Sequence, residues 1–172
     1  MSTDEPVDYE DLTSMRLDDE ALHALVSAGG ECIFNWTTTD GYPVGVVVAY
    51  VYRHGKFWTT CAERRKRVPA LRKRPQSAIV INRGGKTATY KGDSVVHAND
   101  DAGFDELKAW FYPALSGLEA NPNDPYRIAF TKFLDSPHRV IVETDARLVI
   151  GFDTVKFAEF TRQAMAAGHG VD

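Results

Sequence analysis

The stretch from Glu31 to Thr60, ECIFNWTTTDGYPVGVVVAYVYRHGKFWTT, alternates runs of β-branched and aromatic residues with short turn signals. Its three apolar runs are separated by Asp40-Gly41 and by His54-Gly55. Asp-Gly is a strong hairpin signal because both residues tolerate a positive φ, and Gly55 serves the second turn in a similar way. The stretch therefore predicts a three-stranded antiparallel meander. Its middle strand, Val44 to Tyr52, is apolar at nearly every position, which is typical of a strand covered on both faces, as in a barrel wall that also meets a partner.

The rest of the chain adds further strands and several helices. The segments SAIVIN and KTATYKGDSVVHA, joined at Arg83-Gly84-Gly85, predict two strands, and RVIVETD and RLVIGFD predict two more. Apolar residues at helical spacing predict helices over residues 18–28, 100–115, 126–134 and 155–167, and Val68 and Leu71, which lie three apart, predict another in the basic segment. The last of these offers Phe157, Phe160 and Met165 for packing. Six or seven mostly antiparallel strands with peripheral helices favour an α+β domain around a small barrel.

Length and composition indicate a single globular domain. The chain has 172 residues, 44% of them hydrophobic and 26% charged, which is an ordinary globular balance. Residues 1–16 are predicted to form an acidic, flexible lead-in, and residues 17–172 the domain. Neither a signal peptide nor an apolar run long enough to span a bilayer is recognisable, so a cytoplasmic protein without a membrane partner is expected. Cys32 and Cys61 match no metal-ligand spacing and are expected to be reduced and partly buried.

A dense cationic segment follows the meander. Residues 59–75, TTCAERRKRVPALRKRP, hold seven Arg and Lys residues between positions 64 and 74, whereas the whole chain carries a net charge of −4. The cations fall where a predicted strand meets a predicted helix. Such a corner offers unpaired backbone N–H groups, and arginine adds forked donors that match phosphate oxygens. The segment therefore favours a phosphate-bearing ligand, against the plainer interpretation of a solvated basic helix.

The order of these elements resembles a known family. Asp40-Gly41-x-Pro43, an apolar strand through Tyr50, Gly55 with a strand to Thr60, and Arg65-x-Arg67-x-x-x-Leu71-x-x-x-Pro75 together are similar to the split β-barrel of pyridoxamine 5′-phosphate oxidase-like proteins, including the flavin/deazaflavin oxidoreductases. The resemblance covers about residues 32–98. It implies a six- to seven-stranded, mostly antiparallel split barrel that forms a homodimer, with FMN or the deazaflavin F420 in a groove between the subunits.

The resemblance also implies which residues hold the cofactor. Thr60, Arg65, Lys66 and Arg67 fall on the phosphate-binding positions, and the strand Val46 to Val48 would run beside the flat ring. The implied cofactor-binding residues are Val46, Val47, Val48, Thr59, Thr60, Arg65, Lys66 and Arg67. The function implied is hydride transfer to or from a small organic substrate. The cofactor carries that chemistry, so no catalytic side chain and no metal ligand are assigned.

Some questions stay open at this point. The chain lacks the carboxy-terminal Trp/Arg/His cluster of true pyridoxamine phosphate oxidases, so that particular reaction is not expected. FMN and F420 both remain candidates, and the additional cations Arg64, Arg72, Lys73 and Arg74 favour the larger anion slightly. The insertion over residues 100–125, with Trp110, is a candidate wall of a substrate pocket.

Two rival functions also remain. One is a non-catalytic binder of flavin, haem or another planar ligand, which would use the same basic segment without turnover. The other is a nucleic-acid-binding module, in which the basic segment follows a backbone and Phe57 or Trp58 stacks on bases. The net acidic charge opposes a polyanionic partner, so no nucleic acid is expected.

Overall fold

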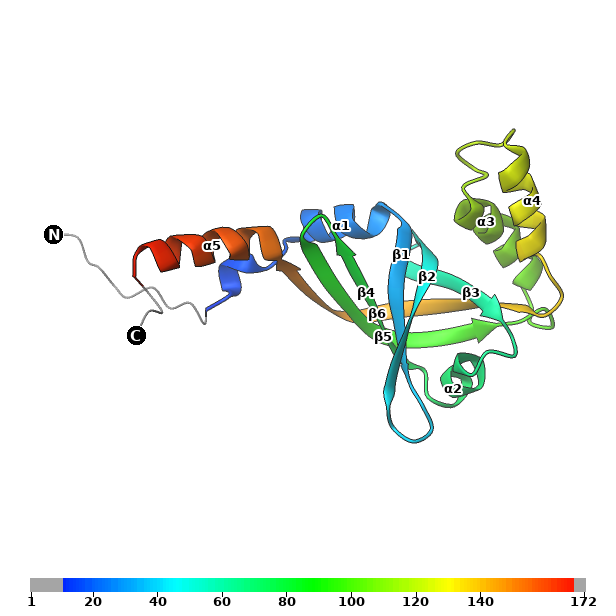
Figure 1. Cartoon of the computed structure of the whole chain (residues 1–172). Helices are drawn as coiled ribbons and strands as arrows, with labels where there is room; N and C mark the ends of the chain where they lie inside the picture. The colour runs from blue at the N-terminus through cyan, green and yellow to red at the C-terminus, as the bar shows by residue number, and fades with distance from the viewer. Residues whose placement is uncertain (1–10, 169–172) are drawn as a thin grey trace.

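The computed structural model describes residues 11–168, which form a closed antiparallel barrel with helices around it (Figure 1). Within that range there are six strands: β1 (Gly30–Thr37), β2 (Pro43–Arg53), β3 (Lys56–Ala62), β4 (Gln76–Arg83), β5 (Lys86–His97) and β6 (Arg139–Asp153). Their order around the barrel is β1-β2-β3-β6-β5-β4, and β4 closes the barrel by pairing with β1. The predicted barrel and the meander of its first three strands are confirmed.

The described part of the chain also has five α-helices and one 3₁₀ helix: η1 (Thr13–Met15), α1 (Asp19–Ser27), α2 (Arg67–Lys73), α3 (Phe104–Ser116), α4 (Pro125–Leu134) and α5 (Thr154–Ala166). An aspartate caps the N-terminus of α1, α4 and α5. The carboxylates of Asp18, Asp124 and Asp153 accept hydrogen bonds from backbone N–H groups of the first turn. Most of the predicted lead-in, residues 1–10, lies outside the described residues. Of its remainder, Met15 is buried. No helix among residues 11–168 combines the length and the apolar character needed to cross a membrane.

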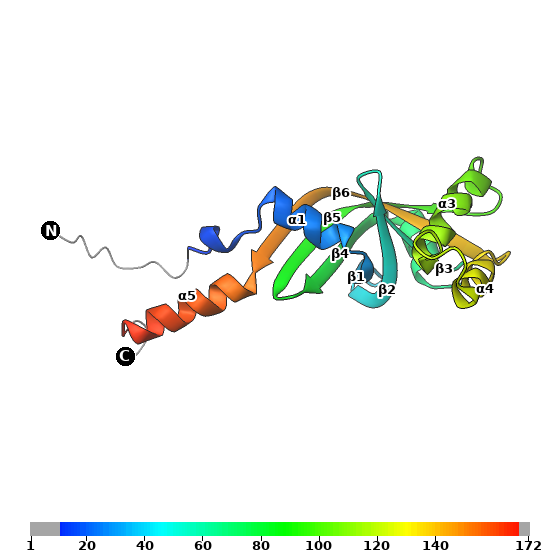
Figure 2. The same cartoon turned by 90° about the horizontal axis from the view of Figure 1, so that it is seen from above.

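Two apolar clusters hold these elements together. The barrel interior contains Phe34, Phe57, Ile79 and Val142, each almost fully buried, with α1 packed against one end. A second cluster joins Trp58 and Ile141 to α3 and includes Phe104, Phe111, Tyr112 and Leu134. The α3–α4 pair therefore lies outside the barrel, beside β3 and β6 (Figures 1 and 2). Pro113 sits inside the last turn of α3, which continues to Ser116.

The prediction of two strands after residue 138 is wrong, because β6 is one continuous strand. Its first half pairs with both β3 and β5, and its second half pairs with β5 alone. The register shifts once, so that Lys91 pairs with Leu148 and Gly92 with Ala146. The residue left over in the sequence, Arg147, is accommodated as a bulge rather than a turn. Glycine is required there because a Cβ at Gly92 would lie 1.8 Å from the Asp145 carbonyl oxygen.

Two apolar surfaces lie open within the single chain. Val47, in the middle of β2, is 63% exposed, so the outer face of this strand is uncovered within the single chain. Helix α5 extends away from the barrel as an arm (Figures 1 and 2) and buries none of its residues. Phe157 and Met165 are among its exposed side chains, although the Phe157 ring does contact Phe152 at 5.6 Å between centroids.

Candidate functional site

The basic corner between β3 and α2 is built by a tight backbone turn. The Arg65 N–H donates to the Ala62 carbonyl at 3.0 Å, and the Val68 N–H donates to the Arg65 carbonyl at 2.9 Å. Val68 and Leu71, each 1% exposed, anchor the short helix α2 to the barrel. Because these two apolar residues point inward, Arg64, Arg65 and Lys66 remain exposed on the corner.

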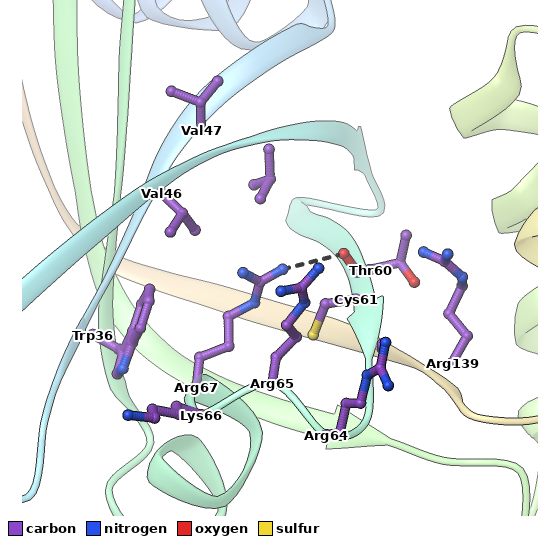
Figure 3. Close-up of a pocket in the computed structure, with 12 residues that line it drawn as sticks. Trp36, Val46, Val47, Thr60, Cys61, Arg64, Arg65, Lys66, Arg67 and Arg139 are labelled. Atoms are coloured by element: carbon purple, nitrogen blue, oxygen red, sulfur yellow. Dashed lines mark hydrogen bonds between the residues drawn. The ribbon is translucent and has the colours of Figure 1, made fainter.

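The corner forms one side of a groove with a volume of about 850 Å³. Its lining residues are Trp36, Val46, Val47, Val48, Thr60, Cys61, Ala62, Arg64, Arg65, Lys66, Arg67 and Arg139. Figure 3 shows Arg65 and Arg67 reaching from the corner toward the β2 valines, with Trp36 and Lys66 at one side and Arg139 at the other. The groove thus places five cationic side chains opposite an apolar wall, and no carboxylate lines it.

The charges of the groove are not neutralised by the part of the chain described. None of its five cations has an ion-pair partner among residues 11–168. Arg67 makes one long hydrogen bond, from Nη2 to the Thr60 carbonyl at 3.5 Å, and the Thr60 hydroxyl donates to the Val140 carbonyl at 2.7 Å. The Nε of Arg139 is buried without any acceptor. An unsatisfied buried donor beside unpaired cations fits a site for an anionic group.

Cys61 forms part of the wall but lacks the character of a nucleophile. Burial raises the pKa of its thiol, and although Arg67, Arg139 and Arg65 act in the opposite direction, the net shift is upward. Burial likewise raises the pKa of Cys32 to about 12. Both cysteines are free and buried, as predicted. The thiol at Cys61 therefore stays protonated near neutral pH and contributes shape rather than reactivity.

The structure brings together all the predicted cofactor-binding residues except Thr59. That residue is 4% exposed and does not line the groove, whereas its neighbour Thr60 does. Side chains alternate along a strand, which turns the Thr59 side chain to the opposite face from that of Thr60. The predicted insertion over residues 100–125 contributes nothing to this groove. Its Trp110 instead packs edge-on against Trp58, with 5.2 Å between centroids.

Sequence reasoning missed Trp36 and Arg139 as groove residues. Trp36 comes from β1, where it pairs with Val44 across the first hairpin. Arg139 comes from the start of β6, far along the chain, and pairs with Ala62. No local motif surrounds either residue, so only strand pairing could have located them. No group of His, Cys, Asp or Glu side chains within residues 11–168 has the arrangement of a metal site.

No family model and no curated protein matches the sequence. Solved structures do match. The conserved hypothetical protein Rv2991 of Mycobacterium tuberculosis aligns with a TM-score of 0.69 and 14% identity over 84% of this chain and 89% of its own. A protein described as an F420 reductase aligns with a TM-score of 0.52 and 14% identity over 74% of this chain and 94% of its own. A pyridoxamine 5′-phosphate oxidase-related, FMN binding protein of Nostoc punctiforme aligns with a TM-score of 0.51 and 13% identity over 75% of this chain and 77% of its own.

At such low identity these likenesses establish the architecture. They confirm that the chain has the split-barrel fold that pyridoxamine 5′-phosphate oxidase-like, FMN-binding and F420-dependent proteins share, as the sequence resemblance predicted.

Proposed function

We propose that the chain is an oxidoreductase of the pyridoxamine 5′-phosphate oxidase-like type. It binds FMN or F420 in the groove beside β2 and transfers hydride to or from a small organic substrate. The observation that carries the proposal is the groove itself, in which five unpaired cations face a wall of three valines. FMN and F420 both combine a flat, largely apolar ring with an anionic arm, and the two sides of the groove match these two parts.

The cationic side would hold the phosphate. Arg65 and Arg67 provide forked donors whose guanidinium groups point into the groove (Figure 3). Arg139 offers a buried Nε that has no other acceptor. Charge-assisted hydrogen bonds of this kind are short and strong. Because α2 is a single short helix, the anchoring is assigned to these side chains and not to a helix dipole.

The apolar side would hold the ring. Val46 and Val48 pack at the edge of the barrel core, which fixes their positions, and Val47 faces outward. The ring supplies the hydride chemistry when bound, and the protein then only has to bind, orient and exclude water. The groove accordingly contains no histidine and no carboxylate to serve as an acid or base.

A second copy of the chain would cover the outer face of this strand. Ile33 and Val47 are direct cross-strand partners, and they are 42% and 63% exposed. Two large apolar side chains exposed side by side, next to a ligand groove, favour burial by a partner. A homodimer with one groove beside each β2 strand would bury these side chains and cover the groove, and it is part of the proposal.

The test is a spectrum of the purified protein followed by a titration. Yellow absorbance in the flavin bands supports FMN, and a colourless protein that quenches the fluorescence of added F420 supports the deazaflavin. Repeated reduction of the bound cofactor by an added reductant and its reoxidation by an added organic acceptor, faster than with the free cofactor, distinguish an oxidoreductase from a non-catalytic binder of planar ligands. If neither cofactor binds and the protein is retained on single-stranded DNA in a salt-sensitive way, the nucleic-acid alternative replaces this proposal.

A further inference from the structure

A second basic groove adjoins the first. It has a volume of about 720 Å³ and lies between the β1–β2 hairpin and α2. Trp36 and Lys66 line both grooves, so the two are continuous around these side chains. The hairpin contributes Thr38, Thr39, Asp40 and Val44, and the helix side contributes Pro69, Ala70, Lys73 and Arg74. The second groove therefore carries three cations, Lys66 included, against the single carboxylate of Asp40.

The two grooves share an unusual feature. Among residues 11–168, only two buried side-chain polar atoms lack a hydrogen-bond partner, and they are Nε of Arg139 and Nε of Arg74. Arg139 lines the first groove, and Arg74 lines the second. Arg74 is held in place by its Nη2, which donates to the Thr37 carbonyl at 3.3 Å. Each groove thus has one arginine whose buried donor is left without an acceptor, which calls for an explanation in each.

Lys73, in the second groove, is not neutralised by an acidic residue of the described chain. Lys73 is exposed and makes no ion pair within the described part of the chain. Its neighbour Arg72, by contrast, pairs with Glu63 at 3.3 Å and lines neither groove. Arg72 is therefore paired away from both grooves, whereas Lys73, at the end of α2, and Arg74, which follows it, line the second groove.

We infer that the two grooves form one site for a cofactor that carries two separated anionic groups. The first group lies against Arg65, Arg67 and Arg139, and the second lies against Lys73 and Arg74, with Lys66 between them. This inference rests on the proposed function and refines it. FMN, with a single phosphate, would leave the second groove unfilled. F420 extends beyond its phosphodiester with glutamate carboxylates, and this extended cofactor has the separated second anionic group that the second groove would recognise. FAD carries its second phosphate bonded directly to the first, so it has a longer arm but no separate second anionic group.

The test compares three probes on one protein by fluorescence titration: FMN, FAD, and F420 with its oligoglutamate tail. We expect the wild-type chain to bind F420 about tenfold more tightly than FMN or FAD, the gain of one charge-assisted contact. Lys73→Glu should weaken binding of the extended cofactor by about tenfold or more and leave the affinity for FMN unchanged within about twofold. Asp40→Asn should strengthen binding of the extended cofactor alone, because it removes the one carboxylate that lines the second groove. FAD should follow FMN in each comparison, because its second phosphate is bonded to the first and does not form a separate group for the second groove.

Arg72→Glu is the matched control, because it reverses one charge on the same helix without touching either groove. It should move none of the three affinities by more than about twofold, since long-range effects of exposed charges are screened. The inference is overturned, and the proposed function stands, if FMN or FAD binds at least as tightly as F420 or if Lys73→Glu weakens the binding of all three alike. If none of the three binds to the wild-type chain, both the proposed function and this inference fail.

Discussion

Arg139 is the antiparallel partner of Ala62, so the first residue of β6 stands beside the last residue of β3. This pairing carries a guanidinium group to the corner where Arg64 to Arg67 already gather. Its Cζ lies 5.3 Å from the centroid of the Phe133 ring, and its buried Nε has no acceptor within residues 11–168. A ladder contact between distant parts of the chain thus completes the cationic side of the groove.

Arg139→Met is expected to separate binding from stability. Methionine keeps an unbranched stem, and the buried unsatisfied donor disappears, which offsets the loss of the contact with Phe133. Cofactor affinity should fall by about 1.5–3 kcal/mol, the value of a hydrogen bond to a charged group. Urea unfolding should show a midpoint no lower than that of the wild-type protein. A large loss of stability with unchanged affinity would show that Arg139 is structural.

Replacing Arg65 and Arg67 together with alanine should weaken cofactor binding by several kcal/mol, at about 1.5–3 kcal/mol for each charge-assisted hydrogen bond. The fold should survive, because Val68 and Leu71 anchor the helix and remain in place. Fluorescence titration measures the affinity, and circular dichroism checks the fold. Arg72→Ala serves as the control and should bind normally. Unchanged binding in the double variant would show that the phosphate binds to another part of the surface.

Val47→Lys should disrupt the proposed dimer without unfolding the barrel. The Val47 side chain is 63% exposed in the single chain, so a lysine there has room and solvent. In an interface the same charge would be desolvated opposite its own copy. Light scattering after size exclusion should show a monomer, with weaker cofactor binding. Tyr126→Lys on α4, at a position that is 75% exposed, is the control and should remain dimeric. A dimeric Val47→Lys protein would place the interface elsewhere.

Glu143 should make stability depend on acid pH. Burial alone would raise the pKa of its carboxyl, but the hydrogen bonds from Lys56 and from His97, the latter at 2.9 Å, outweigh burial and lower it. A carboxyl whose folded pKa lies below its unfolded value of about 4.5 stabilises the fold above that pH and loses this contribution as pH falls through the folded pKa. The loss is therefore expected in the acid range, below about pH 4.5.

Urea unfolding from pH 7 down to pH 3 measures this contribution. The wild-type protein should lose stability more steeply over the acid range than Glu143→Gln, whose amide does not titrate. Parallel curves for the two proteins would contradict a depressed pKa at Glu143.

Gly92→Ala should be among the most damaging small substitutions in the chain. The added Cβ would lie 1.8 Å from the Asp145 carbonyl oxygen, and that atom belongs to the backbone of β6. The two strands would have to separate at the bulge, which we expect to cost about 3 kcal/mol or more of unfolding free energy. Gly41→Ala, at a positive φ with open space around it, should cost only about 1–2 kcal/mol. Chemical denaturation of both variants tests the ranking.

The sequence by itself determined the local features of this protein. Asp40-Gly41 and His54-Gly55 specify tight turns through their own backbone preferences, so the meander follows from neighbouring residues alone. The cationic corner is likewise local, because Arg65 and Arg67 lie within one turn between a strand and a helix whose apolar residues fix its inward face. These signals were enough to predict the meander and the cationic corner, whereas the predicted groove residues came from the resemblance to a known family.

Only the tertiary structure decided which side chains meet. Thr60 faces the groove and Thr59 the barrel interior, and a shift of one residue in the β3–β6 register would exchange them, since side chains alternate along a strand. Arg139 reaches the corner because barrel closure places β6 next to β3, a pairing that no short-range pattern encodes. The strand break predicted near residue 146 became a bulge because Gly92, on the neighbouring strand, lets β6 pass closely without turning. Register and closure are set by the burial of the whole core, so they lie beyond what any local stretch can specify.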